Sequence, residues 1–198
     1  MSTPIWHQPL VSRSERWEAY SLSGATFWLT GLSGSGKSTL ANLASRALFD
    51  KGIQNYVLDA DNLRHGLNKD LKFSDSDRRE NIRRLGETAA LFADAGLVVF
   101  VASISPFEAS RQLVREIHKN NNLPFFEIYV ATSPKECASR DPKGLYAAST
   151  QGTLKGLTGV DSTFEPPQNS DLLLGSDTKE ASAEALTEFC LAKLSNIP

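Results

Sequence analysis

A glycine-rich segment near the amino end of the chain carries residue types that bind polyphosphate. Residues 31–38 read Gly-Leu-Ser-Gly-Ser-Gly-Lys-Ser, which matches the pattern GxxxxGK[ST]. The glycines permit close approach of backbone N–H groups to phosphate, Lys37 can neutralise β- and γ-phosphate charge, and the Ser38 hydroxyl can ligate Mg²⁺. An accidental glycine-rich turn would match this pattern in roughly one chain of this length in a hundred. We therefore interpret the segment as a phosphate-binding loop.

Two aspartates in a second segment are the next candidates for chemistry. Asp59 and Asp61 are two residues apart and lie close to Arg64. Such a pair can orient Mg²⁺, accept a proton from an attacking hydroxyl, or do both. The alternative is helix capping, in which Asp61 caps a helix that begins at Asn62.

A third group of candidates surrounds the start of a predicted long helix. Phe73 precedes this helix, and Arg78 and Asn81 lie in its first turns at a spacing that places them on one face. The two polar residues can hold an anionic second substrate while Phe73 stacks on a base, and ordinary protein surface is the alternative. Further along, Ser105 ends an apolar run and places a hydroxyl in the same crevice, where a helix-capping role is the alternative.

The apolar pattern predicts strands that alternate with helices. Continuous apolar runs predict strands, and apolar residues at helical spacing predict helices. The fully apolar run 97–102 is expected to be a strand buried on both faces and therefore central in the sheet. The predicted strands are 25–30, 56–58, 97–102 and 125–130, and the predicted helices are one after the phosphate-binding loop, 77–95, about 107–118, a short one from about Ser133, and about 179–194.

This alternation predicts an α/β fold with a parallel sheet and helices on both faces. Ligands of such sheets bind at the carboxyl ends of the strands. The phosphate-binding loop, Asp59 and Ser105 all follow predicted strands, so they are expected to meet at one edge. Residues 143–159 contain four glycines and little apolar periodicity, which predicts a mobile loop.

The composition indicates one globular domain that acts on small molecules. The 198 residues are 40% hydrophobic and carry a formal net charge of −2, with Lys and Arg scattered, so neither nucleic acid nor membrane is an expected partner. The longest apolar stretch, 96–102, is too short to span a bilayer, and the start of the chain does not resemble a signal peptide. Cys137 and Cys190 form no metal-binding pattern. We expect a cytoplasmic protein with reduced cysteines.

The sequence resembles the adenylylsulfate kinase family over nearly its whole length. The phosphate-binding loop alone is typical of a superfamily, whereas the further motifs in this order are specific to the family. They are the 59–67 segment, Phe73-Ser-Asp-Ser-Asp-Arg78 with 81–84, 92–94, Ile104-Ser-Pro106, Arg140-Asp-Pro-Lys-Gly-Leu-Tyr146, and 155–156 with 158–159.

The resemblance implies an activity and an architecture. The family phosphorylates the 3′-hydroxyl of adenosine 5′-phosphosulfate (APS) with ATP and Mg²⁺, giving 3′-phosphoadenosine 5′-phosphosulfate (PAPS) in sulfate assimilation. The implied architecture is a three-layer P-loop kinase fold over residues 25–198, with a mobile lid at about 143–165 and an N-terminal arm at 1–24. Within the arm, residues 6–16 are expected either to order against the lid or a second subunit, or to stay loose. A homodimer and coupling to an ATP sulfurylase are also implied.

The resemblance also assigns roles to individual positions of this chain. Lys37, Asp59 and Ser105 would be catalytic, although direct in-line transfer requires no phosphoserine at Ser105. Ser38 and Asp59 would hold the metal. ATP would contact Gly34, Ser35, Gly36, Lys37, Ser38, Thr39 and Arg140, and APS would contact Asp59, Asp61, Asn62, Arg64, Phe73, Arg78, Asn81, Ile104, Ser105, Lys143, Leu157 and Thr158.

Four departures from the family pattern keep other functions open. Leu157 stands where an aromatic residue usually stacks on the APS adenine, Glu108 replaces an arginine, Ala60 replaces a glycine, and 147–150 is uncharged. The alternatives are a kinase of the same fold acting on another nucleotide-like acceptor, and a nucleotide-binding protein without transfer activity. A full set of candidate catalytic groups argues against the second.

Overall fold

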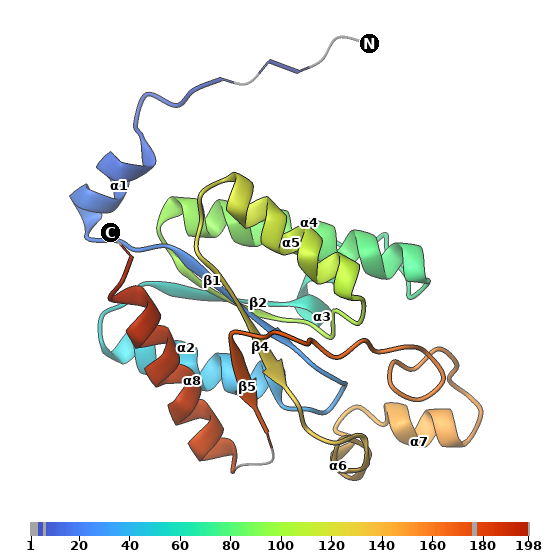
Figure 1. The fold of residues 1–198 in the computed structure, drawn as a ribbon. Coiled ribbons are helices and arrows are strands. Elements are labelled where there is room, and N and C mark those ends of the chain that lie inside the picture. Colours follow the sequence, from blue (N-terminus) through green and yellow to red (C-terminus); the bar gives the residue numbers. More distant parts are fainter. Residues whose placement is uncertain (1–3, 6, 176–177, 198) are drawn as a thin grey trace.

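The computed structural model describes residues 4–5, 7–175 and 178–197. Its centre is a parallel sheet of five strands in the order β2-β3-β1-β4-β5 (Figure 1). Because all five strands run the same way, their carboxyl ends lie at one edge. The strands are β1 (Ala25–Thr30), β2 (Asn55–Asp59), β3 (Val98–Ala102), β4 (Phe125–Val130) and β5 (Leu172–Leu174).

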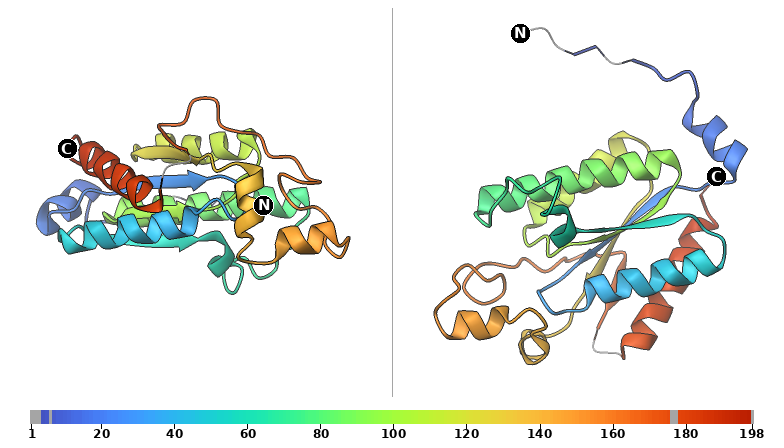
Figure 2. Two further views of the ribbon diagram at one scale, coloured as in Figure 1. Left: turned by 90° about the horizontal axis from the view of Figure 1, so that it is seen from below. Right: turned by 180° about the vertical axis from the view of Figure 1, so that it is seen from behind.

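Helices cover both faces of the sheet, so the fold has three layers, as Figure 2 shows from two further directions. The α2 and α8 helices pack together on one face, and α4 and α5 pack together on the other. The helices are α1 (Arg13–Tyr20), α2 (Lys37–Asp50), α3 (Ala60–Leu63), α4 (Asp75–Ala95), α5 (Glu108–Asn120), α6 (Pro134–Arg140), α7 (Leu145–Thr150) and α8 (Lys179–Leu194).

The side chains of β1 point alternately into the two hydrophobic cores, one on each face of the sheet. Phe27 and Leu29 point into the core formed with α2 and α8, whereas Trp28 points into the core formed with α4 and α5. All six residues of this strand are buried. Burial on both faces explains why the sequence is apolar without interruption here, and it holds the loop that follows β1 on a rigid support.

The parallel α/β fold predicted from the sequence is confirmed. The strands at 25–30 and 125–130 and the helix at 179–194 have the predicted bounds. The strand β3 lies between β2 and β1 with all its residues buried, as predicted for the run 97–102. One expectation is wrong, because part of the loop expected at 143–159 is the helix α7, in which Tyr146 is buried. Neither the helix α1 nor the strand β5 is among the elements predicted from the sequence.

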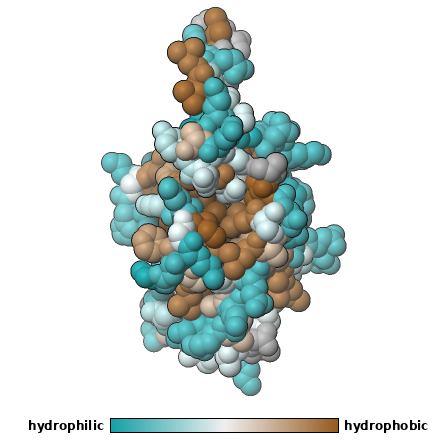
Figure 3. All heavy atoms as spheres, turned by 90° about the vertical axis from the view of Figure 1, so that its left-hand side faces the viewer, coloured by the Kyte–Doolittle hydropathy of each residue, from teal (hydrophilic) through white to brown (hydrophobic). Residues whose placement is uncertain are grey.

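The N-terminal arm contacts the same chain at the end of α4. Arg13 and Arg16 form ion pairs with Asp94, and Trp17 donates its indole N–H to the Asp94 carbonyl over 3.0 Å. Residues 1–3 and 6 of the arm lie outside the described part. Figure 3 views the side of the molecule that carries the arm and shows hydrophobic residues gathered near its centre. In the described ranges, no helix has the length and apolar character needed to cross a membrane.

Candidate active site

The phosphate-binding loop connects β1 to α2 at the carboxyl edge of the sheet. Gly34 and Gly36 have φ angles of +77° and +103°, which favour glycine. Gly36 is also the N-cap of α2, and no side chain caps the helix. The first N–H groups of α2 therefore remain free for a ligand, and the helix dipole favours an anion at this position.

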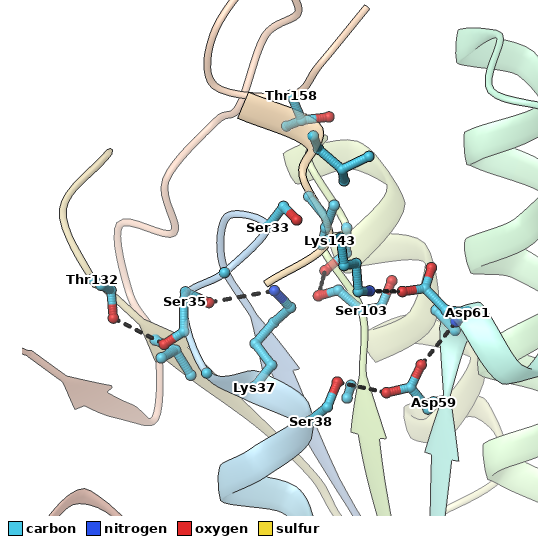
Figure 4. Close-up of a pocket in the computed structure, with 18 of the residues that line it drawn as sticks. Ser33, Ser35, Lys37, Ser38, Asp59, Asp61, Ser103, Thr132, Lys143 and Thr158 are labelled. Carbon is cyan, nitrogen blue, oxygen red and sulfur yellow. Dashed lines mark hydrogen bonds and ion pairs between the residues drawn. The ribbon is translucent and has the colours of Figure 1, made fainter. Parts of the chain in front are cut away.

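Lys37 is buried at the start of α2, and its ammonium group lies over the loop. Its Nζ donates to the Gly31 and Leu32 carbonyls over 2.9 and 2.7 Å and to Ser35 Oγ over 3.3 Å. Figure 4 shows Lys37 between Ser35 and the aspartates. Burial lowers the pKa of Lys37 to about 8. A phosphate group at the loop would supply the negative charge that this buried ammonium lacks.

The Asp59 carboxylate joins the end of β2 to the phosphate-binding loop. Its Oδ2 accepts a hydrogen bond from the Ser38 hydroxyl over 2.6 Å, and its Oδ1 accepts one from the Asp61 backbone N–H over 2.9 Å. Asp59 is thus the N-cap of α3. The alternative in which Asp61 caps a helix beginning at Asn62 is wrong, because the carboxylate of the last strand residue reaches the free N–H first.

The donor atoms of Ser38 and Asp59 suit a hard divalent cation. A hydroxyl and a carboxylate oxygen are ligands that Mg²⁺ accepts, usually together with substrate phosphates and water. Among the described residues, no group of three or more His, Cys, Asp or Glu side chains is close enough to hold a metal alone. The chemistry of this pair therefore fits a metal that arrives with a nucleotide.

Asp61 and Arg78 connect the opposite side of the site to the 143–165 segment. The Asp61 carboxylate forms an ion pair with Lys143 (Figure 4). The Arg78 guanidinium donates to Thr158 Oγ1 over 3.1 Å, to Ser162 Oγ over 2.8 Å, and to the Gly156 carbonyl. Two charged groups that the resemblance assigns to the APS pocket thus contact the predicted lid.

The aromatic and amide candidates differ in exposure. Phe73 is 68% exposed, and the Arg64 guanidinium lies 4.5 Å from the centre of its ring. Asn81 is buried and accepts a hydrogen bond from Asn68 Nδ2 over 3.0 Å. The ring is therefore available for stacking, whereas Asn81 is held in place by a neighbouring amide.

Ser105 is buried on the turn after β3 in a left-handed conformation, with φ +39°. Its Oγ accepts a hydrogen bond from Trp28 Nε1 over 3.0 Å and donates one to Thr30 Oγ1 over 2.9 Å. The N-cap of α5 is Phe107, so the helix-capping alternative for Ser105 is wrong. A positive φ is costly for a residue with a Cβ, which makes this turn a strained point beside the site.

The 143–165 segment folds back onto the phosphate-binding loop. Leu157 and Tyr146 form a buried cluster with Leu32 and Cys137. The Tyr146 hydroxyl donates to the Ser33 carbonyl over 3.0 Å. Burial raises the pKa of Tyr146 to about 12 and also raises the pKa of the Cys137 thiol. Leu157 thus packs against the loop where the family pattern has an aromatic ring.

A single cavity of about 1110 Å³ collects the candidate residues. This exceeds the volume of a typical pocket for one drug-sized ligand and suits two nucleotides. Asn62 is exposed on α3 and is the one predicted site residue outside the cavity wall. The others line it, namely Gly34, Ser35, Gly36, Lys37, Ser38, Thr39, Asp59, Asp61, Arg64, Phe73, Arg78, Asn81, Ile104, Ser105, Arg140, Lys143, Leu157 and Thr158.

Sequence reasoning missed several residues of the wall. Ser33, Ser103, Thr132 and Lys155 also line the cavity. Thr132 Oγ1 donates to the Ser35 carbonyl over 2.9 Å and so supports the phosphate-binding loop. Ser103 and Thr132 follow β3 and β4, so their place at the carboxyl ends of strands was the available signal.

A phosphate-binding loop that faces carboxylates and an arginine across one cavity, at the edge of a parallel sheet, defines a P-loop kinase. Comparison with known proteins narrows this class. The family model described as "Adenylylsulphate kinase" matches residues 23–175. The chain belongs to the adenylylsulfate kinase family.

Individual relatives match almost end to end. A probable adenylyl-sulfate kinase of Bacillus subtilis is 47% identical over 96% of this chain and 97% of its own. The adenylyl-sulfate kinase of Prochlorococcus marinus is 49% identical over 90% of this chain and 88% of its own. Among solved structures, a Mycobacterium tuberculosis APS kinase in complex with AMPPNP and APS is 47% identical, with a TM-score of 0.84 over 86% of this chain and 99% of that chain.

Proposed function

We propose that this enzyme transfers the γ-phosphoryl group of ATP to the 3′-hydroxyl of APS, giving PAPS and ADP. The observation that carries the proposal is that Lys37 and Ser38 of the phosphate-binding loop line one cavity, sized for two nucleotides, together with Asp59 and Arg78. The relative from M. tuberculosis, solved with an ATP analogue and APS, supports the same pairing of substrates. This reaction is a step of sulfate activation.

On the donor side, the chain stabilises charge that spreads over the γ-phosphoryl oxygens. The free N–H groups at the start of α2 and the Lys37 ammonium point at this charge from fixed positions. A Mg²⁺ held by Ser38 and Asp59 would neutralise further phosphate charge. The buried setting of Lys37 strengthens its interaction with phosphate relative to water.

On the acceptor side, Asp59 is the group that receives or directs the 3′-hydroxyl proton. Arg78, Lys143 and Arg64 supply positive charge for the phosphosulfate, and the exposed ring of Phe73 supplies a stacking surface for the adenine. Asn81 and Ile104 line the same side of the cavity. Orientation of the two substrates contributes most of the remaining rate enhancement.

We propose that 143–165 acts as a lid over both nucleotides. In support, this segment contacts Arg78 and Asp61, which line the cavity, and it packs against Leu32 of the phosphate-binding loop. Closure keeps water from taking the phosphoryl group, so hydrolysis of ATP without acceptor should be slow.

Three further properties are proposed with the family resemblance as their support. They are a homodimer, a cytoplasmic location, and functional coupling to an ATP sulfurylase. Light scattering of the purified chain measures the first property, since a dimer has twice the mass of the chain.

One observation favours a second candidate, a kinase of the same fold with another nucleotide-like acceptor. Leu157 packs on Leu32 and offers no ring to an adenine. The test incubates the purified chain with ATP, Mg²⁺ and each of APS, AMP and adenosine, and quantifies the phosphorylated products. PAPS as the main product supports the proposal. Preference for another acceptor selects the second candidate, and ATP binding without any product indicates a nucleotide-binding protein without transfer activity.

A further inference from the structure

Arg111 is a buried residue of α5 that connects two walls of the cavity without lining it. Its side chain is 0% exposed. Its Nη1 donates to the Ser105 carbonyl over 2.8 Å, and its Nη2 donates to the Glu165 carbonyl over 2.8 Å. Ser105 lies on the strained turn after β3, and Glu165 ends the proposed lid. One guanidinium therefore fixes the distance between these two backbone positions.

The end of the lid has additional contacts with the same turn. The Glu165 N–H donates to the Pro106 carbonyl over 2.8 Å, and its carboxylate accepts from the Glu108 N–H over 2.6 Å. Arg111 also pairs with the Glu108 carboxylate. Residues 105–108 and Glu165 thus form one hydrogen-bonded unit centred on Arg111.

A buried carboxylate forms an ion pair with this guanidinium and balances its charge. Arg111 Nε lies 2.7 Å from Glu127 Oε1, and the Glu127 side chain is 4% exposed. Arg115, one turn further along α5, lies 3.2 Å from the other oxygen of Glu127 and 3.3 Å from Asp171. The planar guanidinium of arginine can donate to two carbonyls while it stays paired with Glu127, whereas the single ammonium of lysine cannot.

We infer that Arg111 is a positioning residue for phosphoryl transfer, which couples the end of the lid to the turn that carries Ser105. The inference rests on the proposed function. Arg111 contacts neither substrate position. It fixes where the closed lid presents Thr158 and Leu157 relative to Ile104 and Ser105, all of which line the acceptor side of the cavity.

The test compares Arg111→Lys with Arg115→Lys in the full chain. Both variants keep a positive charge beside Glu127, but only Arg111 contacts Ser105 and Glu165. For Arg111→Lys we expect the KM for APS to rise roughly tenfold and kcat to fall, because misplacement of a positioning group disturbs substrate geometry. The KM for ATP should change by less than about twofold in either variant, because the phosphate-binding loop is untouched. A lower melting temperature with unchanged KM and kcat per folded molecule would show a structural role only and overturn the inference.

The rate of proteolysis in the lid is a second readout, and it does not require the acceptor substrate. Trypsin can cleave the lid after Lys155, which is exposed. With AMPPNP bound, cleavage in Arg111→Lys should be roughly tenfold faster than in Arg115→Lys, because only the first variant releases the end of the lid. Equal cleavage in the two variants overturns the inference. Absence of PAPS formation by the unaltered chain instead overturns the proposed function, so the two failures are distinguishable.

Discussion

The Ser38 hydroxyl lies 2.6 Å from Asp59 Oδ2 and donates a hydrogen bond to it. This contact joins the first turn of α2 to the last residue of β2, and so joins the phosphate-binding loop to the segment that faces the acceptor. Both atoms are also the proposed ligands of Mg²⁺. In the proposed mechanism, the donor and acceptor substrates therefore meet beside Ser38 and Asp59, which would hold the metal and direct the transferred proton.

The first prediction concerns proton uptake by Lys37. Burial lowers its pKa to about 8 in the nucleotide-free protein, and triphosphate should raise this pKa by stabilising the ammonium. Between the two pKa values, ATP binding takes up a proton, so ATP affinity falls as the pH rises above about 8. Calorimetry at about pH 9 in buffers of different ionisation enthalpy measures this uptake.

Lys37→Arg is the matched control, because arginine stays charged in both states. The variant should bind ATP without proton uptake. Equal uptake in the two proteins would assign the proton to another group and contradict the prediction.

The second prediction is that Ser105 carries no phosphoryl group during transfer. Its hydroxyl is buried and already makes hydrogen bonds to Trp28 and Thr30. Ser105→Ala should therefore keep activity within about tenfold of the unaltered chain, losing only an orienting contact. Rapid quenching with intact-mass analysis should find no phosphorylated protein. A phosphoprotein that forms and decays at the catalytic rate, and that is absent from Ser105→Ala, would show the opposite.

The third prediction is that a ring at position 157 improves APS binding. Stacking of a base on an aromatic side chain is worth about 1–3 kcal/mol, so Leu157→Phe should lower the KM for APS by roughly fivefold or more. The KM for ATP should stay unchanged. Val160→Phe is the control, since Val160 is exposed in the same segment and does not line the cavity.

The packing around Leu157 determines how this result is interpreted. Its neighbours Leu32 and Tyr146 leave it 6% exposed, and overpacking can cost about 1–3 kcal/mol. A melting temperature recorded beside the kinetics separates the two effects. An unchanged KM for APS in a stable Leu157→Phe variant would mean that position 157 does not face the adenine.

Much of the fold follows from apolar runs and helical spacing, and the exceptions have physical causes. The strand β5 has three residues, which is too short for a pattern. The helix α1 has no buried residue and so no apolar stripe. Its available signal was the capping box of Ser12 and Glu15, which the structure contains.

The sequence predicts those site residues that belong to a short motif of neighbouring positions. The phosphate-binding loop is local, and the family motifs name Asp59, Arg78 and Lys143. Residues that act through tertiary contacts belong to no such local motif. Arg111 is separated from Glu165 by more than fifty positions, and only the folded chain shows that the two meet. Asn62 shows the reverse case, in which a residue of a family motif is exposed and does not line the cavity.

The most direct test of this account measures PAPS formation from ATP, Mg²⁺ and APS by the unaltered chain, by Asp59→Asn and by Asp50→Asn. Asp50 is the control because it pairs with Arg46 on the exposed surface of α2. We expect the unaltered chain and Asp50→Asn to form PAPS at similar rates. Asp59→Asn should be slower by a factor on the order of 10²–10⁴ while still binding ATP. PAPS formation by Asp59→Asn at the unaltered rate, or none by the unaltered chain, would contradict the account.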